Sequence, residues 1–294
     1  MRYKQDTLLC SQIDSPAQII VGEYGYHPIQ HSIEGSRQRL ECEHLEGKVR
    51  INPLTKRSVS LKFEDRLCLN YKGLAYKTEW LEFPEIAPHC LKHGIPATST
   101  KADGTPFYTL PAIYDPSTGS YISDSFAIAV YLDATYPSTP SIFSHGTQGL
   151  QASFESAFTP QVRDLWPAMY KPLFAYLNDP SANYMGSCQV PGKGLTVMEL
   201  IPRVEEVKII RTKTEEDLWK VHGWYQNAGR SVGDPGPFMM GEVVSWTDFV
   251  VCAHFLSWRT ILGVDSKEWK EMEKWNTSRW GALVKSLEKY QAVH

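Results

Sequence analysis

The sequence predicts a small α/β domain with a mixed sheet, followed by an all-helical domain. Between residues 48 and 140, short apolar runs typical of strands alternate with runs that have helical spacing. From residue 150 onward the pattern is helical and rich in tryptophan and tyrosine. The linker-like stretch PSTPSIFSHGTQG separates the two parts, so we expect the domain boundary between residues 137 and 150.

Short elements fill the first part of the chain. Residues 1–47 contain one apolar run, Ile19-Ile20-Val21, and are otherwise polar and charged, so we expect an extension with short elements. Gly73 and Gly94 stand where helices would stop. The expected elements are, in order, a strand at 48–52, a helix at 63–71, a strand at 75–83, a helix at 84–93, a loop at 97–106, strands at 108–115 and 121–122, and a helix to about 136.

The composition is typical of a soluble globular protein, with 42% apolar and 21% charged residues in a chain of 294. A net charge of -3 gives no general attraction to nucleic acid or anionic membranes. The six cysteines are scattered, which suits free thiols in a reducing compartment, and the nine histidines lack metal-binding spacing. Neither a signal-peptide core nor an apolar window of ~18 residues is present. We expect a cytoplasmic protein that binds no metal, nucleic acid or membrane.

A proline inside a strand-like run gives the first indication of a ligand site. Pro111 interrupts the run Tyr108–Tyr114, where it removes a donor from the sheet and can adopt a cis bond. Leu110, just before it, could then offer its backbone N–H and C=O to an extended peptide, as in recognition by strand addition. An ordinary edge-strand proline is the alternative.

The triplet Ser123-Asp124-Ser125, which opens an apolar helical run, gives the second indication. A helix N-terminus carries unpaired N–H groups and partial positive charge, so it favours a carboxylate. Ser125 can add a hydroxyl donor to the same anion, and Asp124 can hold an ammonium group. Ordinary helix capping is the alternative.

The two indications together resemble the glutathione site of glutathione transferases. The sequence is most similar to the fungal FuA-type, or etherase-like, class in the stretches LNYKGLAYKTEWLEF, TKADGTPFYTLPAIYDPSTG and SDSFAIAVYLDATYP. The resemblance runs from about Arg66 to Pro140 and continues more loosely through the helical region. It implies a thioredoxin-like domain over 48–140 and an all-helical C-terminal domain over 150–294, with 1–47 as a poorly matched N-terminal extension.

The resemblance also implies a role for each site residue. The Leu110 backbone, before a cis Pro111, would pair with the cysteinyl amide of glutathione. Ser125 would bind the γ-glutamyl carboxylate, and Asp124 the γ-glutamyl amine. Lys101 could reach the glycyl end, although a solvated loop is the alternative. The family further implies a homodimer.

The implied activity is attack of the glutathione thiolate on an electrophilic or aryl-ether-like aromatic molecule, or reduction of a peroxide, with glutathione as co-substrate. The alternative is a non-catalytic glutathione-family binder, or ligandin, of aromatic compounds. In this family the thiol is activated from the loop before the first helix, where Ser58 and Ser60 stand.

The motif around these serines departs from the family pattern, and two interpretations are open. The first strand and loop are divergent, with 48–52 as the strand and Ser58 or Ser60 as the thiol donor. Otherwise the N-terminal sequence comes from an altered segment and leaves a damaged domain.

Two patterns mark the C-terminal half. Trp166, Tyr170 and Phe174 share one helical face, which indicates the wall of an acceptor pocket for aromatic compounds or, alternatively, the core between the domains. Ser245 and Asp248 have the spacing of a capping box before an apolar helix, within a G-x-x-x-S-x-x-D element that the family uses for helix stability. We expect this pair to be structural.

Overall fold

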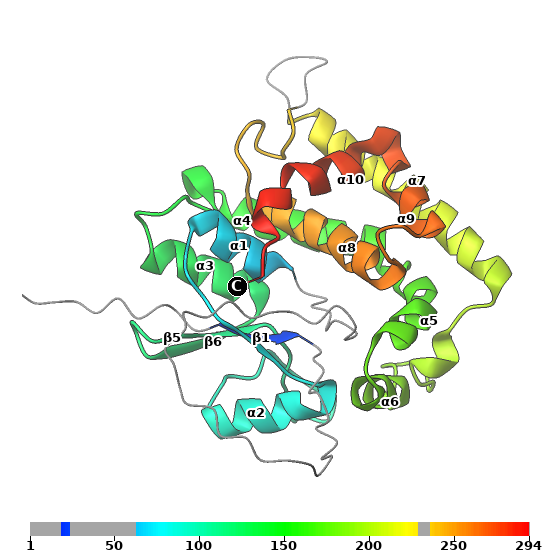
Figure 1. Ribbon diagram of the computed structural model, residues 1–294, viewed down its shortest axis with the longest axis horizontal. Coiled ribbons are helices and arrows are strands. Elements are labelled where there is room, and N and C mark those ends of the chain that lie inside the picture. Colours follow the sequence, from blue (N-terminus) through cyan, green and yellow to red (C-terminus); the bar gives the residue numbers. More distant parts are fainter. Residues whose placement is uncertain (1–18, 24–62, 229–235, 294) are drawn as a thin grey trace, which may run out of the picture.

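The structure of the chain is a computed structural model that describes residues 19–23, 63–228 and 236–293. In Figure 1, strands and three helices form a small α/β part, and α4 to α10 form a larger helical part. The predicted fold class, an α/β domain followed by an all-helical domain, is confirmed. The domain limits at 48–140 and 150–294 stay predictions.

The described strands of the small part form separate two-stranded sheets, in place of the one mixed sheet that was predicted. Strand β1 (Ile19–Glu23) pairs in parallel with β2 (Thr78–Trp80). Strand β5 (Ala112–Asp115) pairs antiparallel with β6 (Ser120–Ser123). Strand β1 also lies beside β5, which brings the two pairs together (Figure 1).

The parallel strand comes from a part of the chain where the sequence analysis expected an extension. The apolar run Ile19-Ile20-Val21 belongs to β1, whereas the strand expected at 48–52 lies outside the described residues. A run of three apolar residues is too short for periodicity to identify as a strand. Its pairing with β2 and its position beside β5 define it.

Three helices cover the strands. Helices α1 (Glu64–Lys72) and α3 (Ser125–Thr135) lie on one face and α2 (Ile86–His93) on the other (Figure 1). Helices α1 and α2 end at Gly73 and Gly94, as predicted, each with φ of 68°. Glycine adopts this left-handed conformation without the steric cost of a Cβ.

The strand expected at 75–83 is shorter in the structure, because the chain turns early into a helical conformation. The Glu82 N–H donates a hydrogen bond to Oε2 of Glu85 at 2.9 Å. This contact starts a 3₁₀ turn at Phe83–Glu85, which leads directly into α2.

The loop expected at 97–106 contains a small antiparallel hairpin. Strand β3 (Ser99–Thr100) pairs with β4 (Pro106–Phe107). Strands of two residues have no periodic pattern for the sequence to reveal. The hairpin holds Lys101 in its turn, where the Lys101 N–H donates to the Thr105 carbonyl at 2.8 Å.

The described residues of the C-terminal part are mostly helical. Three 3₁₀ turns, Ser144–Gly146, Met198–Leu200 and Glu288–Tyr290, accompany the helices. The helices are α4 (Gln148–Arg163), α5 (Trp166–Tyr176), α6 (Asp179–Ser187), α7 (Val204–Gln226), α8 (Trp246–Leu262), α9 (Lys267–Met272) and α10 (Trp275–Ser286).

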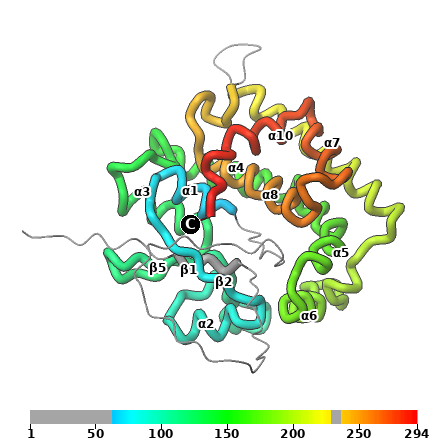
Figure 2. The backbone as a smooth tube through the Cα atoms, viewed as in Figure 1, coloured from blue at the N-terminus to red at the C-terminus, as the bar shows by residue number. Residues whose placement is uncertain are grey.

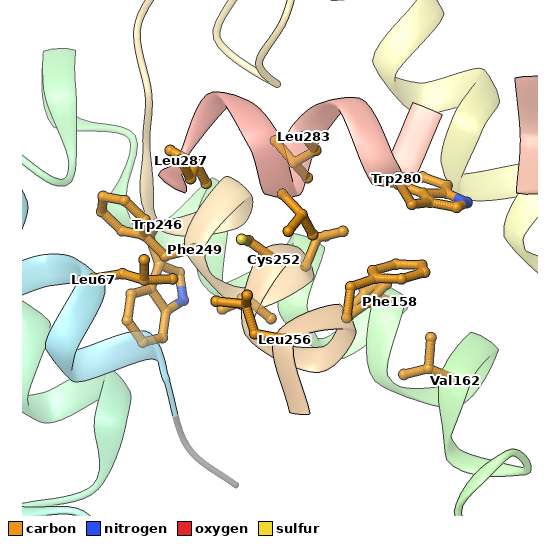
Figure 3. Packing of buried hydrophobic residues seen from close by; sticks show 14 of the residues in the cluster. Leu67, Phe158, Val162, Trp246, Phe249, Cys252, Leu256, Trp280, Leu283 and Leu287 are labelled. Atoms are coloured by element: carbon orange, nitrogen blue, oxygen red, sulfur yellow. The ribbon is translucent and has the colours of Figure 1, made fainter. Parts of the chain in front are cut away.

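Helix α8 is the centre of the molecule. It packs against α1, α4, α5, α9 and α10. Figure 3 shows Leu67 of α1, Phe158 of α4 and Trp280 of α10 arranged around the α8 side chains Phe249 and Leu256. One hydrophobic core therefore runs through both parts of the chain.

The C-terminal end returns to the small part and lies beside α1 (Figure 2). The Asn70 amide donates to the carbonyl oxygens of Tyr290 at 2.8 Å and Ala292 at 2.9 Å. The Tyr76 hydroxyl donates to the same Ala292 carbonyl at 3.1 Å. Side-chain bonds to backbone thus connect the two parts a second time.

A buried hydrogen-bond network precedes α8. Asp248, fully buried in the first turn, accepts the Ser245 N–H at 2.9 Å and the Ser245 hydroxyl at 3.0 Å. Its other oxygen accepts the Tyr225 hydroxyl at 3.0 Å and the Met239 N–H at 2.9 Å. Burial raises the pKa of the Asp248 carboxyl to about 6, although these hydrogen bonds act in the opposite direction. The contacts are those of a structural residue.

We expect Asp248→Ala to lower the free energy of unfolding by about 2 kcal/mol or more. Loss of a helix cap costs ~0.5–2 kcal/mol, and each buried donor left without a partner costs about 1–3 kcal/mol. Urea denaturation followed by circular dichroism would measure the change.

Ser266→Ala is the matched control, because Ser266 caps α9 through one bond, from the Trp269 N–H at 3.1 Å. It should cost about 1 kcal/mol. Equal losses in the two variants would contradict a special role for the Asp248 network.

Candidate functional site

The residue before α3 has an unusual backbone conformation. Asp124 has φ of 81°, a region that residues other than glycine rarely adopt. Its N–H donates to the Pro111 carbonyl at 3.3 Å, and its Oδ1 accepts the Ala127 N–H at 3.0 Å. Such conformations cost of order 1–3 kcal/mol and cluster at ligand sites, where the surrounding structure enforces them.

Ser125, the first residue of α3, carries a polar group in need of a partner. The residue is 7% exposed, and its hydroxyl makes no hydrogen bond within the described part of the chain. By contrast, the hydroxyl of Ser123 donates to the Pro96 carbonyl at 2.8 Å. Ser125 lies at the positive end of an 11-residue helix. A carboxylate would satisfy both the hydroxyl and the free N–H groups of the first turn.

The segment before β5 presents an open backbone edge. The bond between Leu110 and Pro111 is cis. Neither the N–H nor the C=O of Leu110 bonds to another residue in the described ranges. The preceding residue is anchored, because the Thr109 hydroxyl lies 2.8 Å from the Thr98 hydroxyl. An extended ligand can therefore pair with Leu110 without displacing protein contacts.

A cavity of about 530 Å³ lies between the two parts of the molecule. The small part lines it with Glu64, the start of α2, Lys101 and the segment 106–110. Leu110 belongs to this lining, and the carbonyl of the next residue, Pro111, accepts the Asp124 N–H at the start of α3. The helical part contributes Trp166 from α5, Tyr184 and Met185 from α6, Cys188, and His254 and Ser257 from α8.

A polar contact holds the two sides of the cavity together. The Asn178 amide donates to Oε1 of Glu82 at 2.8 Å, and the Ser181 hydroxyl donates to the other carboxylate oxygen. The Phe83 N–H donates to Oγ of Ser181 at 3.0 Å. The Phe83 and Tyr184 rings stack with centroids 6.3 Å apart. Glu82 and Phe83 thus connect the small part to α6.

The aromatic face predicted on α5 is divided in the structure. Trp166 lines the cavity. Tyr170 and Phe174 are absent from its described lining and instead pack in a cluster around Leu173 and Ile261. The helical face that carries Trp166, Tyr170 and Phe174 is therefore divided between the cavity and the interior of the protein.

The other predicted site residues divide into three groups. Leu110 and Lys101 line the cavity, and Asp124 and Ser125 lie beyond Pro111 at the start of α3. Ser58 and Ser60 lie outside the described residues.

Sequence reasoning missed four polar residues, of which His254, Ser257 and Cys188 line the cavity and Glu82 connects its two sides. His254 and Ser257 interrupt the apolar helix α8 three residues apart, so they share a face. That spacing within an otherwise apolar run was the available signal. Cys188 and Glu82 lie at helix ends without a pattern, and only the packing of α6 against Phe83–Glu85 brings them to the site.

Comparisons with known proteins agree with this geometry. The profile of the glutathione S-transferase N-terminal domain matches residues 66–135, and that of the C-terminal domain matches residues 149–290. A glutathione S-transferase of Ceriporiopsis subvermispora, crystallised with glutathione, is 30% identical with a TM-score of 0.77, over 95% of this chain and 99% of that one. The chain belongs to the glutathione S-transferase family.

Further relatives indicate which class of glutathione S-transferases this chain resembles. Glutathione transferase GSTFuA3 of Phanerochaete chrysosporium is 26% identical with a TM-score of 0.76, over 95% of this chain and 99% of that one. The glutathione S-transferase-like protein ustS of Aspergillus flavus is 28% identical over 74% of this chain and 79% of its own length. The predicted similarity to fungal FuA-type glutathione transferases is confirmed.

Two features are absent from the described residues. None of the helices in the described ranges is long and apolar enough to cross a membrane. No group of three or more His, Cys, Asp or Glu side chains in these ranges is arranged to hold a metal ion.

We expect Glu82→Ala to lower the free energy of unfolding by about 2 kcal/mol or more. The substitution leaves the Asn178 amide and the Ser181 hydroxyl without their acceptor, at about 1–3 kcal/mol for each buried group. Urea denaturation would measure the loss.

Glu199→Ala is the matched control. Glu199 also accepts two hydrogen bonds, from the N–H and hydroxyl of Thr196 at 2.8 Å each, but it is exposed. Surface changes of this kind stay within about 0.5 kcal/mol. A Glu82→Ala loss as small as that of the control would show that the contact with α6 contributes little.

Proposed function

We propose that this protein binds glutathione and uses its thiol to conjugate electrophilic aromatic molecules or to cleave them at an aryl-ether-like bond. The observation that carries the proposal is the buried hydroxyl of Ser125, which has no partner within the described ranges and lies at a helix N-terminus. Family membership and the glutathione-containing relative support the same ligand.

The proposed binding mode uses four groups of the protein. Ser125 and the first turn of α3 bind the γ-glutamyl carboxylate, and Asp124 binds the adjacent amine. The free backbone groups of Leu110 pair with the cysteinyl amide. Lys101, at the cavity, binds the glycyl carboxylate. Each group meets a ligand group of complementary charge or hydrogen-bonding type.

In the proposed reaction, the glutathione sulfur attacks an electrophilic carbon of the acceptor. A carbon–sulfur bond forms, and the bond from that carbon to the leaving group breaks. The thiolate is the nucleophile, and an ordinary thiol has a pKa near ~8.5, so the protein must favour its deprotonation. We propose Ser58 or Ser60 as the hydrogen-bond donor that stabilises the thiolate.

Aromatic side chains support an aromatic acceptor. Trp166, Tyr184 and Phe83 line the cavity next to Leu110, so an acceptor ring would lie between apolar walls. The same walls support the second candidate function, a non-catalytic binder of aromatic compounds. Family resemblance is the basis for two further proposals, a homodimer and a cytoplasmic location.

We expect Ser125→Ala to weaken glutathione binding by about 1.5–3 kcal/mol, the usual contribution of a hydrogen bond to a charged group. Isothermal titration calorimetry would measure the affinity. Ser123→Ala is the control, since the Ser123 hydroxyl donates to the Pro96 carbonyl. The glutathione affinity of this variant should equal that of the parent. Equal affinities of the parent and Ser125→Ala would remove Ser125 from the site.

The ultraviolet absorbance of bound glutathione thiolate, followed as pH is raised, separates the enzyme from the binder. A transferase should show a midpoint well below ~8.5, and the midpoint should return toward that value in a Ser58→Ala/Ser60→Ala double variant. An ordinary midpoint in the parent, together with tight binding of aromatic ligands, would favour the binder.

A further inference from the structure

One residue of the small part is bonded to both sides of the cavity. Glu82 is 9% exposed. Its carboxylate accepts the Asn178 amide at 2.8 Å and the Ser181 hydroxyl, both from the start of α6. Its backbone N–H donates to Oε2 of Glu85 at 2.9 Å, in the turn that leads into α2. Because α2 and α6 each contribute to the cavity lining, Glu82 helps to set the position of one lining element relative to the other.

Helix α6 follows α5 in the sequence but packs on the small part. Its main element contact is with the turn at Phe83–Glu85, whereas α5 packs on α8 (Figure 1). The chain is extended at Leu177 and Asn178, just before α6, and again at Cys188, just after it. Extended residues therefore join α6 to its neighbours in sequence, and contacts with the small part contribute to fixing its position.

Asn178 forms its contact with Glu82 in place of a local helix cap. Asparagine is among the preferred N-cap residues, because its side-chain oxygen accepts an N–H of the first helical turn. Asn178 occupies the N-cap position of α6, yet its side chain makes no such bond. Its amide donates to Glu82 instead. The Glu82 carboxylate thus lies at the positive end of α6, where the helix dipole favours a negative charge.

Two aromatic rings extend this contact into the cavity. Phe83, next to Glu82, and Tyr184, one turn after Ser181, both belong to the lining. Their rings are nearly parallel, with 12° between the planes and 6.3 Å between the centroids. The Phe83 N–H donates to Oγ of Ser181 at 3.0 Å, so the backbone that carries one ring is bonded to the helix that carries the other. A shift of α6 would therefore change the spacing of the two rings.

We propose that Glu82 is a positioning residue for a planar aromatic acceptor, an inference that rests on the proposed function. Glu82 is not part of the described cavity lining, so it acts through α6. It holds this helix where Tyr184 and Phe83 can contact the same acceptor. Attraction between non-bonded carbons is best at about 3.5–4.0 Å and weakens when a gap opens. A flat acceptor gains from both rings only while their spacing is maintained.

Asn178→Asp is the variant that tests this role. Aspartate is as good an N-cap as asparagine, but its carboxylate would face that of Glu82, and like charges repel. We expect the affinity for the fluorescent aromatic probe anilinonaphthalene sulfonate to fall about tenfold, the size of one lost aromatic contact. Glutathione affinity by calorimetry should stay within about twofold of the parent, because none of the groups proposed to bind glutathione belongs to α6.

A rescue and a control accompany this variant. Adding Glu82→Gln to Asn178→Asp should restore the probe affinity, because the new amide can donate to the new carboxylate while its oxygen still accepts the Ser181 hydroxyl. Ser266→Asp is the control, since it adds a carboxylate at the N-cap of α9, outside the described cavity lining. It should keep both parental affinities. Ser181→Ala, which removes the same contact from its other side, replaces Asn178→Asp if that variant fails to fold.

A second comparison distinguishes positioning from a purely structural role. Tyr184→Ala alone should also weaken binding of the probe. In that background Asn178→Asp should add little, because both substitutions act through the same ring. If Glu82 only stabilised the fold, the two effects on probe affinity would instead be independent and additive.

The outcomes separate this inference from the function on which it rests. Unchanged probe affinity in Asn178→Asp, no recovery with Glu82→Gln, or additive effects with Tyr184→Ala overturns the positioning role, irrespective of glutathione binding. A parent that binds the probe but not glutathione overturns the proposed function, and the same variants still decide the role of Glu82. A parent that does not bind the probe overturns the aromatic acceptor and the positioning role together.

Discussion

The burial of the first turn of α8 is the constraint on which the rest of the structure depends, because the N–H groups of this turn must find hydrogen-bond partners inside the protein. The Trp246 N–H donates to the Ile142 carbonyl, and the Thr247 N–H donates to Oε1 of Gln151. Asp248 accepts the Ser245 N–H and also holds Tyr225 and Met239 in place. The surrounding helices, including α1 from the small part, all pack against α8.

The cavity lies where this close packing ends. Its two sides come from different parts of the chain, and the Glu82 contacts with α6 keep them in a fixed relation. An ion pair holds the small part itself together, because Lys72 of α1 lies 2.7 Å from Asp133 of α3, which also accepts the Ile142 and Phe143 N–H groups. Burial alone would raise the pKa of the Asp133 carboxyl, but hydrogen bonds from Lys72 and these N–H groups outweigh it and lower the pKa.

Features with a strong local cause were predictable from the sequence. Gly73 and Gly94 end helices because only a residue without Cβ adopts their backbone conformation easily. The short strand β1 and the hairpin β3–β4 were not predicted as strands, since tertiary pairing defines such elements and no residue pattern reveals them. The division of the face shared by Trp166 and Tyr170 depends on how α5 lies against its neighbours, which its sequence does not encode.

The return of the C-terminal segment to α1 has a consequence for how the molecule is made. Asn70 finds its backbone acceptor at Tyr290, 220 residues further along the chain. A ribosome adds ≈ 5–20 residues per second and domains generally fold as they emerge, so α1 spends tens of seconds at these rates without this partner. The small part therefore completes its hydrogen bonding after the helical part has been synthesised.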